Sequence, residues 1–298
     1  MPTPRLAFAS GLAAILLAAF VGSASAVTVG IADQKPDMFN DARFTSLGLR
    51  AARINVAWDA LRVPADTAAL DAWMRAARAH GVQPLITIDR SRTARHRAPS
   101  VAEYATQVRA LHARYPFVRD WSAWNEANHY GQPTGRKPRL AARYWLALRK
   151  ACAGCRVLGA DLLDQPNMVK WVRAFQRAAH RRPAQWGLHN YVDANRLRTT
   201  GTRRLLRATH AQIWLTETGG LVTRRNGSAT KLAAGPAHAA KVTRFILTKL
   251  VRLSPRIARV YLYHWNANAA ALTWDSGFVG PDGNARPALG VLRGFLHR

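Results

Sequence analysis

The regular alternation of short apolar runs with amphipathic helical patterns constrains the fold of this chain more than any other feature. The runs are rich in Val, Ile, Leu, Tyr and Trp, and most are continuously apolar, as expected for parallel strands that are covered on both faces. Eight strands are predicted on this basis, at residues 27–33, 51–58, 82–89, 118–126, 157–163, 186–191, 212–218 and 259–265.

Helices are predicted at residues 66–80, 100–115, 138–152, 167–180, 236–253 and 287–296. Eight strands in roughly 270 residues, with helical patterns between them, match a (β/α)8 barrel in number and in size. A doubly wound sheet is the alternative, but it usually opens with a glycine-rich phosphate loop, and residues 31–36 contain no glycine. We therefore predict an α/β chain that folds as a single-domain (β/α)8 TIM barrel.

The first 26 residues have the layout of a secretory signal peptide: Arg5, an apolar run from Leu6 to Phe20, and small residues that end at Ala26. The apolar run has about 15 residues, fewer than the roughly 20 that span a bilayer, which favours cleavage over a membrane anchor. We expect a signal peptide over residues 1–26, a catalytic domain over residues 27–298, no membrane span, and a secreted product in the extracellular space or cell envelope.

The charge balance is strongly basic, with 44 Lys and Arg residues against 16 Asp and Glu residues, a formal net charge of +28. Such a surface attracts polyanions, so an acidic polysaccharide, an anionic envelope or nucleic acid is one interpretation. A compositional habit rich in Arg and Ala is the other, since the Arg residues are spread along the chain. Without a nucleic-acid-binding motif, no specific nucleic acid partner is expected.

The only cysteines, Cys152 and Cys155, form a C-x-x-C pair. In an exported protein this spacing favours a short structural disulfide, and no second pair or nearby His pair completes a metal site. We predict a disulfide, no metal and no cofactor.

Two predicted strands carry a glutamate at or next to their C-terminal end. Residues 121–128 read W-S-A-W-N-E-A-N and contain Glu126; residues 213–220 read I-W-L-T-E-T-G-G and contain Glu217. Catalytic groups of such barrels lie at the C-terminal strand ends, and a charge in an apolar strand end is costly unless it is used or paired. The alternative is that each glutamate is a structural ion-pair partner of one of the many arginines.

These motifs resemble those of the retaining glycoside hydrolases of clan A, in which an Asn-Glu pair ends the fourth strand and a Glu ends the seventh. The resemblance covers essentially the whole mature chain. It implies that Glu126 is the general acid/base, that Glu217 is the nucleophile, and that Asn125 binds the sugar 2-hydroxyl. The general acid needs a raised pKa, which the apolar surroundings near Trp124 are expected to supply.

Other strand ends carry residues to which the resemblance gives supporting roles. Arg53 matches a strand-two Arg that hydrogen-bonds the nucleophile, His189 and Tyr191 match residues that contact the carboxylates, and Trp265 matches a strand-eight Trp that forms the floor of the subsite for the reacting sugar. Each taken singly could equally be a core residue. Trp124 and Tyr130 are further candidates for binding sugar, because the apolar C–H patches of a pyranose stack on aromatic rings.

The chain also departs from the clan. Residues 87–90, T-I-D-R, stand where several of its families have a His at the end of strand three, and no β-sandwich is appended. Family 39-like exopolysaccharide hydrolases and Asl1-like glucanases fit the size best.

The predicted function is hydrolysis of β-glycosidic bonds in an extracellular or envelope polysaccharide, by double displacement and as a monomer. Two alternatives stay open: a catalytically silent barrel that binds glycans or an anionic surface, and a transglycosylase that uses the same residues.

Overall fold

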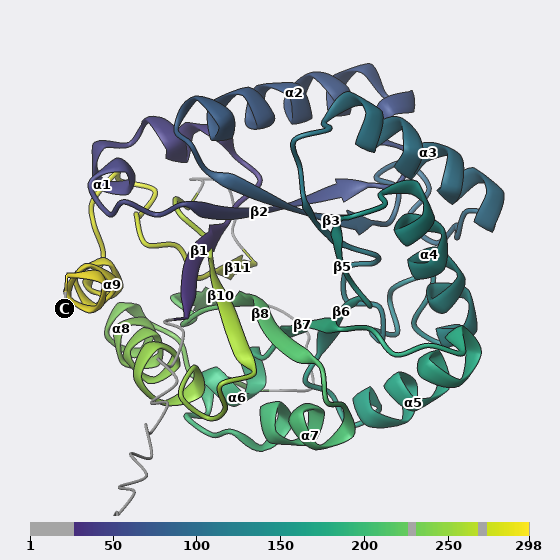
Figure 1. Cartoon of the computed structure of the whole chain (residues 1–298). Coiled ribbons are helices and arrows are strands. Elements are labelled where there is room, and N and C mark those ends of the chain that lie inside the picture. Colours follow the sequence, from purple (N-terminus) through teal and green to yellow (C-terminus); the bar gives the residue numbers. More distant parts are fainter. Residues whose placement is uncertain (1–26, 226–230, 268–272, 298) are drawn as a thin grey trace, which may run out of the picture.

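The computed structural model describes residues 27–225, 231–267 and 273–297. Its central sheet is entirely parallel, with the strand order β5-β4-β3-β2-β1-β10-β8-β7-β6. Figure 1 shows these strands as a ring inside a ring of helices, so the predicted single-domain (β/α)8 TIM barrel is confirmed. The strands are β1 (Thr28–Ala32), β2 (Ala51–Ala57), β3 (Gln83–Asp89), β4 (Asp120–Ser122), β5 (Arg156–Leu158), β6 (Asp161–Leu163), β7 (Gln185–His189), β8 (Gln212–Thr218) and β10 (Ile257–Tyr263).

The predicted signal peptide, residues 1–26, lies outside the described residues. Among the helices that the structure does describe, none is long and apolar enough to cross a membrane.

The predicted strand at residues 157–163 is two short strands, β5 and β6, separated at Gly159 and Ala160. β5 pairs with β4 and β6 pairs with β7, so the chain changes partners in the middle of this strand position. Backbone hydrogen bonds continue across the break, from Asp161 N to Trp124 O (2.9 Å) and from Gly187 N to Ala160 O (3.0 Å). These bonds close the barrel.

The helices are α1 (Ala42–Thr45), α2 (Pro64–Ala79), α3 (Val101–Arg114), α4 (Pro138–Ala151), α5 (Met168–Ala179), α6 (Tyr191–Asn195), α7 (Thr200–Ala208), α8 (Pro236–Phe245) and α9 (Pro287–Leu296). α3 begins with a capping box, in which Ser100 and Glu103 satisfy each other's backbone N–H groups. α6 and α7 lie between β7 and β8, where the sequence pattern predicts no helix. The predicted helix at residues 236–253 is α8 followed by a π-helical turn, Ile246–Leu250.

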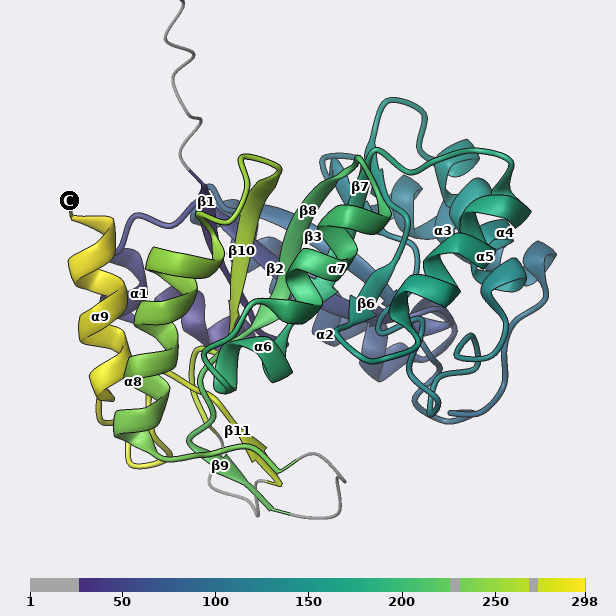
Figure 2. The same ribbon diagram turned by 90° about the horizontal axis from the view of Figure 1, so that it is seen from below.

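A small antiparallel ribbon lies at the C-terminal end of the barrel, formed by β9 (Thr223–Arg224) and β11 (Trp274–Asp275). Figure 2 shows it projecting from the end at which β8 and β10 finish. It therefore stands beside the mouth of the barrel, where the strands present their carboxyl ends.

The barrel interior has an apolar layer and a polar layer. The apolar layer contains Ala32, Ala51, Leu85, Leu158, Trp214 and Tyr261. One step further along the strands, the inward positions are polar and buried: Arg53, Thr87, Ser122, Asp161 and His189. A separate, larger core of apolar side chains packs the helices on the outside of the sheet.

Gly187 in β7 makes room for this polar layer. A methyl group at its Cα would overlap the carboxylate of Asp161 and the hydroxyl of Thr216. The Asp161 side chain thus rests directly on the β7 backbone, which requires glycine at this position.

We expect Gly187→Ala to lower the free energy of unfolding by about 1–3 kcal/mol, because the added methyl group displaces a buried ion-paired carboxylate. Urea denaturation measures the change. Gly290→Ala is the matched control: Gly290 is an exposed residue of α9 and a methyl group there meets nothing, so this variant should be neutral or slightly stabilised. Equal stability of the two variants would contradict the close approach at Gly187.

Candidate active site

Arg53 is the centre of the polar layer and is only 1% exposed. It projects inward from β2, and its guanidinium donates hydrogen bonds to side chains from four other strand positions. The acceptors are Asp161 Oδ2 (2.7 Å), Asn125 Oδ1 (2.9 Å), Glu217 Oε2 (2.9 Å) and Thr87 Oγ1 (3.1 Å). One buried cation therefore fixes side chains from β3, β6, β8 and the segment that follows β4.

Asp161, which sequence reasoning missed, is the buried counter-ion of Arg53. Its carboxylate also accepts hydrogen bonds from Ser122 Oγ (2.7 Å) and Thr87 Oγ1 (2.9 Å). Burial by itself would raise the pKa of Asp161, but the charge of Arg53 and the hydrogen bonds hold it well below its usual range. The signal was an acidic residue inside the otherwise apolar run 157–163.

His189, the last residue of β7, lies among three carboxylates. Its Nδ1 is 3.4 Å from Glu126 Oε1 and 3.9 Å from Glu217 Oε2, and its Nε2 is 3.5 Å from Asp161 Oδ2. Burial lowers the pKa of His189, but the charge of Glu217 and the interactions with Asp161 and Glu126 outweigh it and raise the pKa to about 9. The imidazole is therefore protonated at neutral pH.

Glu126 occupies the left-handed region of backbone conformation, with a φ of 45°. This conformation is costly for a residue with a side chain, and such strain concentrates at functional sites. Burial raises the pKa of Glu126, but the hydrogen bond and charge of His189 outweigh it, so the net shift is downward. The expectation of a raised pKa is thus wrong, because the charge and hydrogen bond of His189, which the resemblance placed against the carboxylates, outweigh the effect of burial.

Glu217 lies in β8 and accepts two hydrogen bonds that hold both of its oxygens. Arg53 binds Oε2, and the Tyr191 hydroxyl donates to Oε1 at 3.1 Å. Tyr191 is the first residue of α6, and its ring packs edge-on against Trp274 of β11, with the centroids 4.8 Å apart. The ribbon formed by β9 and β11 therefore reaches the immediate surroundings of Glu217.

Asn125 lies between Arg53 and a second carboxylate that sequence reasoning missed. Its Nδ2 donates to Asp89 Oδ2 at 3.2 Å, and Gln132 Nε2 donates to Asp89 Oδ1 at 3.2 Å. Asp89 ends β3, so a third strand also finishes in an acid. Burial raises the pKa of Asp89 to about 6. A backbone hydrogen bond from Arg90 opposes this shift, and the negative charge of Glu126 adds to it.

The predicted aromatic residues lie in different surroundings. Trp124 is fully buried and stacks on Tyr144 of α4, on the outside of the sheet. Trp265 is also fully buried and packs against Phe44, with the centroids 5.3 Å apart. Neither ring is exposed to bind a sugar.

Two other aromatic rings border the catalytic face. Tyr130 is 81% exposed in the segment that follows Glu126. Tyr263, the last residue of β10, lines a hollow together with Asp89. Tyr263 lies two residues after Tyr261 in the same strand, so both side chains point to the same, inward face. This spacing can be read from the sequence.

Cys152 and Cys155 form a disulfide just before β5, at the barrel end opposite Glu126. The side chain of His112 approaches both sulfurs, with the three ligand-type atoms within 4.8 Å of one another. This cluster takes no part in the site around Arg53.

The solved structures with this fold include several glycosidases. A monomeric β-xylosidase from Caulobacter crescentus matches with a TM-score of 0.63 and 15% identity, over 90% of this chain and 67% of that chain. An endo-1,4-β-xylanase from Caldicellulosiruptor owensensis matches with a TM-score of 0.65 and 10% identity, over 90% of this chain and 96% of that chain. A family 39 glycoside hydrolase from Bacteroides cellulosilyticus matches with a TM-score of 0.59 and 14% identity, over 92% of this chain and 64% of that chain.

No protein-family model matches the chain, and no curated protein matches its sequence. At these low identities the structural likeness establishes a shared fold. The chain has the barrel fold of these glycoside hydrolases.

The raised pKa of His189 makes stability depend on pH. Its native pKa of about 9 exceeds the unfolded value of about 6.5, so its contribution is complete below pH 6.5 and is lost as the pH rises through 9. We expect the free energy of unfolding to fall by up to about 3 kcal/mol across this window, and His189→Gln to remove that part of the fall. Urea denaturation at several pH values measures it.

His210→Gln is the control, because His210 is exposed on the surface and should leave the decline intact. Burial raises the pKa of Asp164 to about 7. Asp164 titrates in the wild type and in both variants, so its contribution cancels in the comparison. Parallel curves for wild type and His189→Gln would show that the histidine is not charged in the native state.

Proposed function

We propose that this protein is a retaining β-glycosidase, with Glu217 as nucleophile and Glu126 as general acid/base. The observation that carries the proposal is the convergence of both carboxylates on one atom, His189 Nδ1. Because the distances from this nitrogen to Glu126 Oε1 and Glu217 Oε2 are 3.4 Å and 3.9 Å, the two carboxylates lie next to one imidazole nitrogen, which is compatible with the roughly 5–5.5 Å between the carboxyl groups of retaining enzymes.

In the first step, a Glu217 oxygen attacks the anomeric carbon while the bond to the leaving oxygen breaks and Glu126 gives that oxygen a proton. In the second step, Glu126 takes a proton from water, the water oxygen bonds to the anomeric carbon, and Glu217 leaves as a carboxylate. The hydrogen bonds from Arg53 and Tyr191 hold the Glu217 carboxylate in position for the attack in the first step.

The proton for the first step comes from the His189–Glu126 pair. In the ligand-free site the lowered pKa of Glu126 and the raised pKa of His189 keep this proton on the imidazole, 3.4 Å from Glu126 Oε1. A sugar that enters the site excludes water and disfavours separated charges, which promotes transfer of the proton to Glu126. His189 is therefore a positioning and proton-holding residue in this proposal.

The exposed ring of Tyr130 and the half-buried ring of Trp274 are proposed as stacking surfaces for sugars on either side of the cleaved bond. We further propose that the substrate is an extracellular or cell-envelope polysaccharide, which is supported by the signal-peptide pattern of residues 1–26.

We expect Glu217→Ala to lower kcat by about 10³-fold or more, because no covalent intermediate can form. The assay follows release of reducing ends from a panel of neutral and acidic β-glycans. Sodium azide should restore part of the turnover of an activated aryl glycoside and yield a glycosyl azide of inverted configuration, which NMR identifies.

Glu126→Ala should behave differently: it should retain turnover of an activated aryl glycoside, whose leaving group needs no protonation, while losing polysaccharide hydrolysis. Asp71→Asn is the control, because Asp71 is a surface residue of α2 that pairs with Arg114. This variant should be fully active. Full activity of Glu217→Ala would exclude the proposed mechanism.

A further inference from the structure

A hollow of about 430 Å³ opens at the C-terminal face of the barrel, beside the two catalytic candidates. It lies over the ends of β2, β3 and β10, at the edge of the polar layer. Its walls include Asn55, Asp89, Arg90, Arg92, Arg95 and Tyr263.

Two of these residues join the hollow to the candidate active site. Asp89 accepts a hydrogen bond from Asn125, the neighbour of Glu126. Tyr263 ends β10, which pairs with β8, the strand that carries Glu217, and the residue before Tyr263 lies opposite Thr218. A sugar chain held at Glu217 can therefore extend directly into the hollow.

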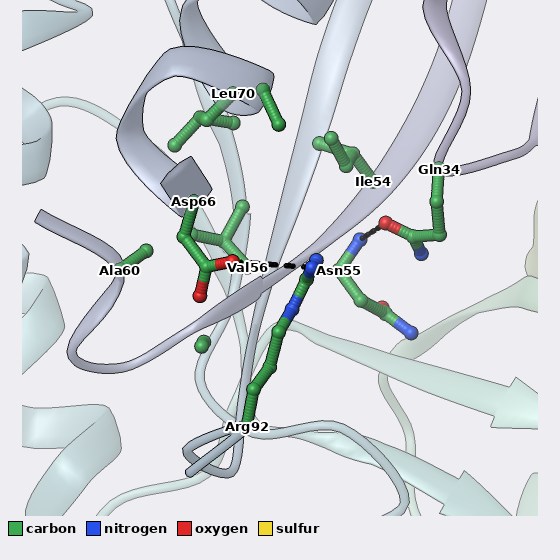
Figure 3. A pocket seen from close by; sticks show the side chains of 10 residues that line it. Gln34, Ile54, Asn55, Val56, Ala60, Asp66, Leu70 and Arg92 are labelled. Atoms are coloured by element: carbon green, nitrogen blue, oxygen red, sulfur yellow. Dashed lines mark hydrogen bonds and ion pairs between the residues drawn. The ribbon is translucent and has the colours of Figure 1, made fainter. Parts of the chain in front are cut away.

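The hollow is basic because three arginines follow β3 within six residues. Arg90 Nη1 donates to Gly131 O at 2.9 Å, and its guanidinium forms no ion pair with a carboxylate in the described part of the chain. Arg92 pairs with Asp66 at the start of α2, at 3.2 Å. Figure 3 shows this pair in a smaller adjoining pocket, which Gln34 also lines. Arg95 is exposed and has no ion pair with any described residue.

Asp89 is the one carboxylate in the lining of the hollow. Its raised pKa of about 6 means that mild acid removes its negative charge. The remaining polar groups in the lining are uncharged, and Arg92 is partly compensated by Asp66, so Arg90 and Arg95 supply most of the positive potential at this position.

We propose that this hollow binds an anionic substituent, a carboxylate or a sulfate, on a sugar unit next to the cleaved bond, so that the preferred substrate is an acidic glycan. The inference rests on the proposed function, since it names the substrate class of the same site. Guanidinium groups bind planar oxyanions through paired, charge-assisted hydrogen bonds. A neutral sugar would displace water from these guanidinium groups without offering them a negative charge, which opposes its binding.

The test uses β-1,4-linked glucan, mannan and galactan oligosaccharides, each in neutral, C6-carboxylate and 6-O-sulfate forms. We expect kcat/KM for an anionic form to exceed that of its neutral counterpart by about tenfold or more. The double variant Arg92→Gln/Arg95→Gln should remove this preference, so that kcat/KM for the anionic forms falls to about that of the neutral forms. The carboxylate and sulfate arms identify which anion the hollow takes.

Arg173→Gln/Arg177→Gln is the matched control, because both arginines are exposed on α5 and the variant loses the same charge. α5 lies across the barrel from β2 and β3 (Figure 1). Loss of the preference in this control would mean that overall charge, and not the hollow, selects anions. A preference for neutral glycans, or an anion preference that survives in Arg92→Gln/Arg95→Gln, would overturn the inference.

Calorimetry in a Glu217→Gln background separates this inference from the proposed function. Binding of an anionic oligosaccharide that requires Arg92 and Arg95, without any hydrolysis by the wild type, would retain the hollow as a site and reject the catalytic proposal. Failure of every anionic oligosaccharide to bind would reject the hollow, whatever the hydrolytic activity.

Discussion

The buried ion pair between Arg53 and Asp161 is the interaction on which the candidate site depends. Both side chains are shielded from water, so each charge would be very costly without the other. Replacing such a pair by apolar residues is often neutral for stability, so folding alone does not explain it. The pair also orients the guanidinium: Arg53 Nη2 donates to both Asp161 and Asn125, and this leaves Nη1 directed at Glu217.

The charges around this pair do not cancel. Two cations, Arg53 and protonated His189, face three carboxylates, those of Asp161, Glu126 and Glu217. The excess negative charge is what keeps the proton on His189 in spite of its burial. In the proposed mechanism, formation of the covalent intermediate neutralises Glu217, so the pKa of His189 falls as the reaction proceeds. Proton position and covalent chemistry are therefore coupled through one imidazole.

The barrel follows from the alternation of strand and helix patterns, which the sequence contains, and the resemblance of the strand-end motifs to those of clan A implied the convergence of Arg53, Asn125, His189, Tyr191 and Glu217. Other features depend on where strands stop. Asp161 was hidden because β5 and β6 divide one apolar run, and Trp265 is buried because the chain leaves the barrel after Tyr263. The direction in which the pKa of Glu126 is shifted depends on a 3.4 Å contact with His189, which no local sequence pattern encodes.

The net charge of +28 illustrates the same distinction between composition and placement. A diffuse positive surface attracts any polyanion, and salt at physiological strength screens it beyond about 8 Å. Three guanidinium groups around one hollow act at contact distance and on one substituent of one sugar. Composition alone cannot separate these two effects, because it counts Arg95 and Arg173 alike. The different places of Arg95 and Arg173 in the fold separate the two effects, since only a charge next to the reacting sugar can distinguish one glycan from another.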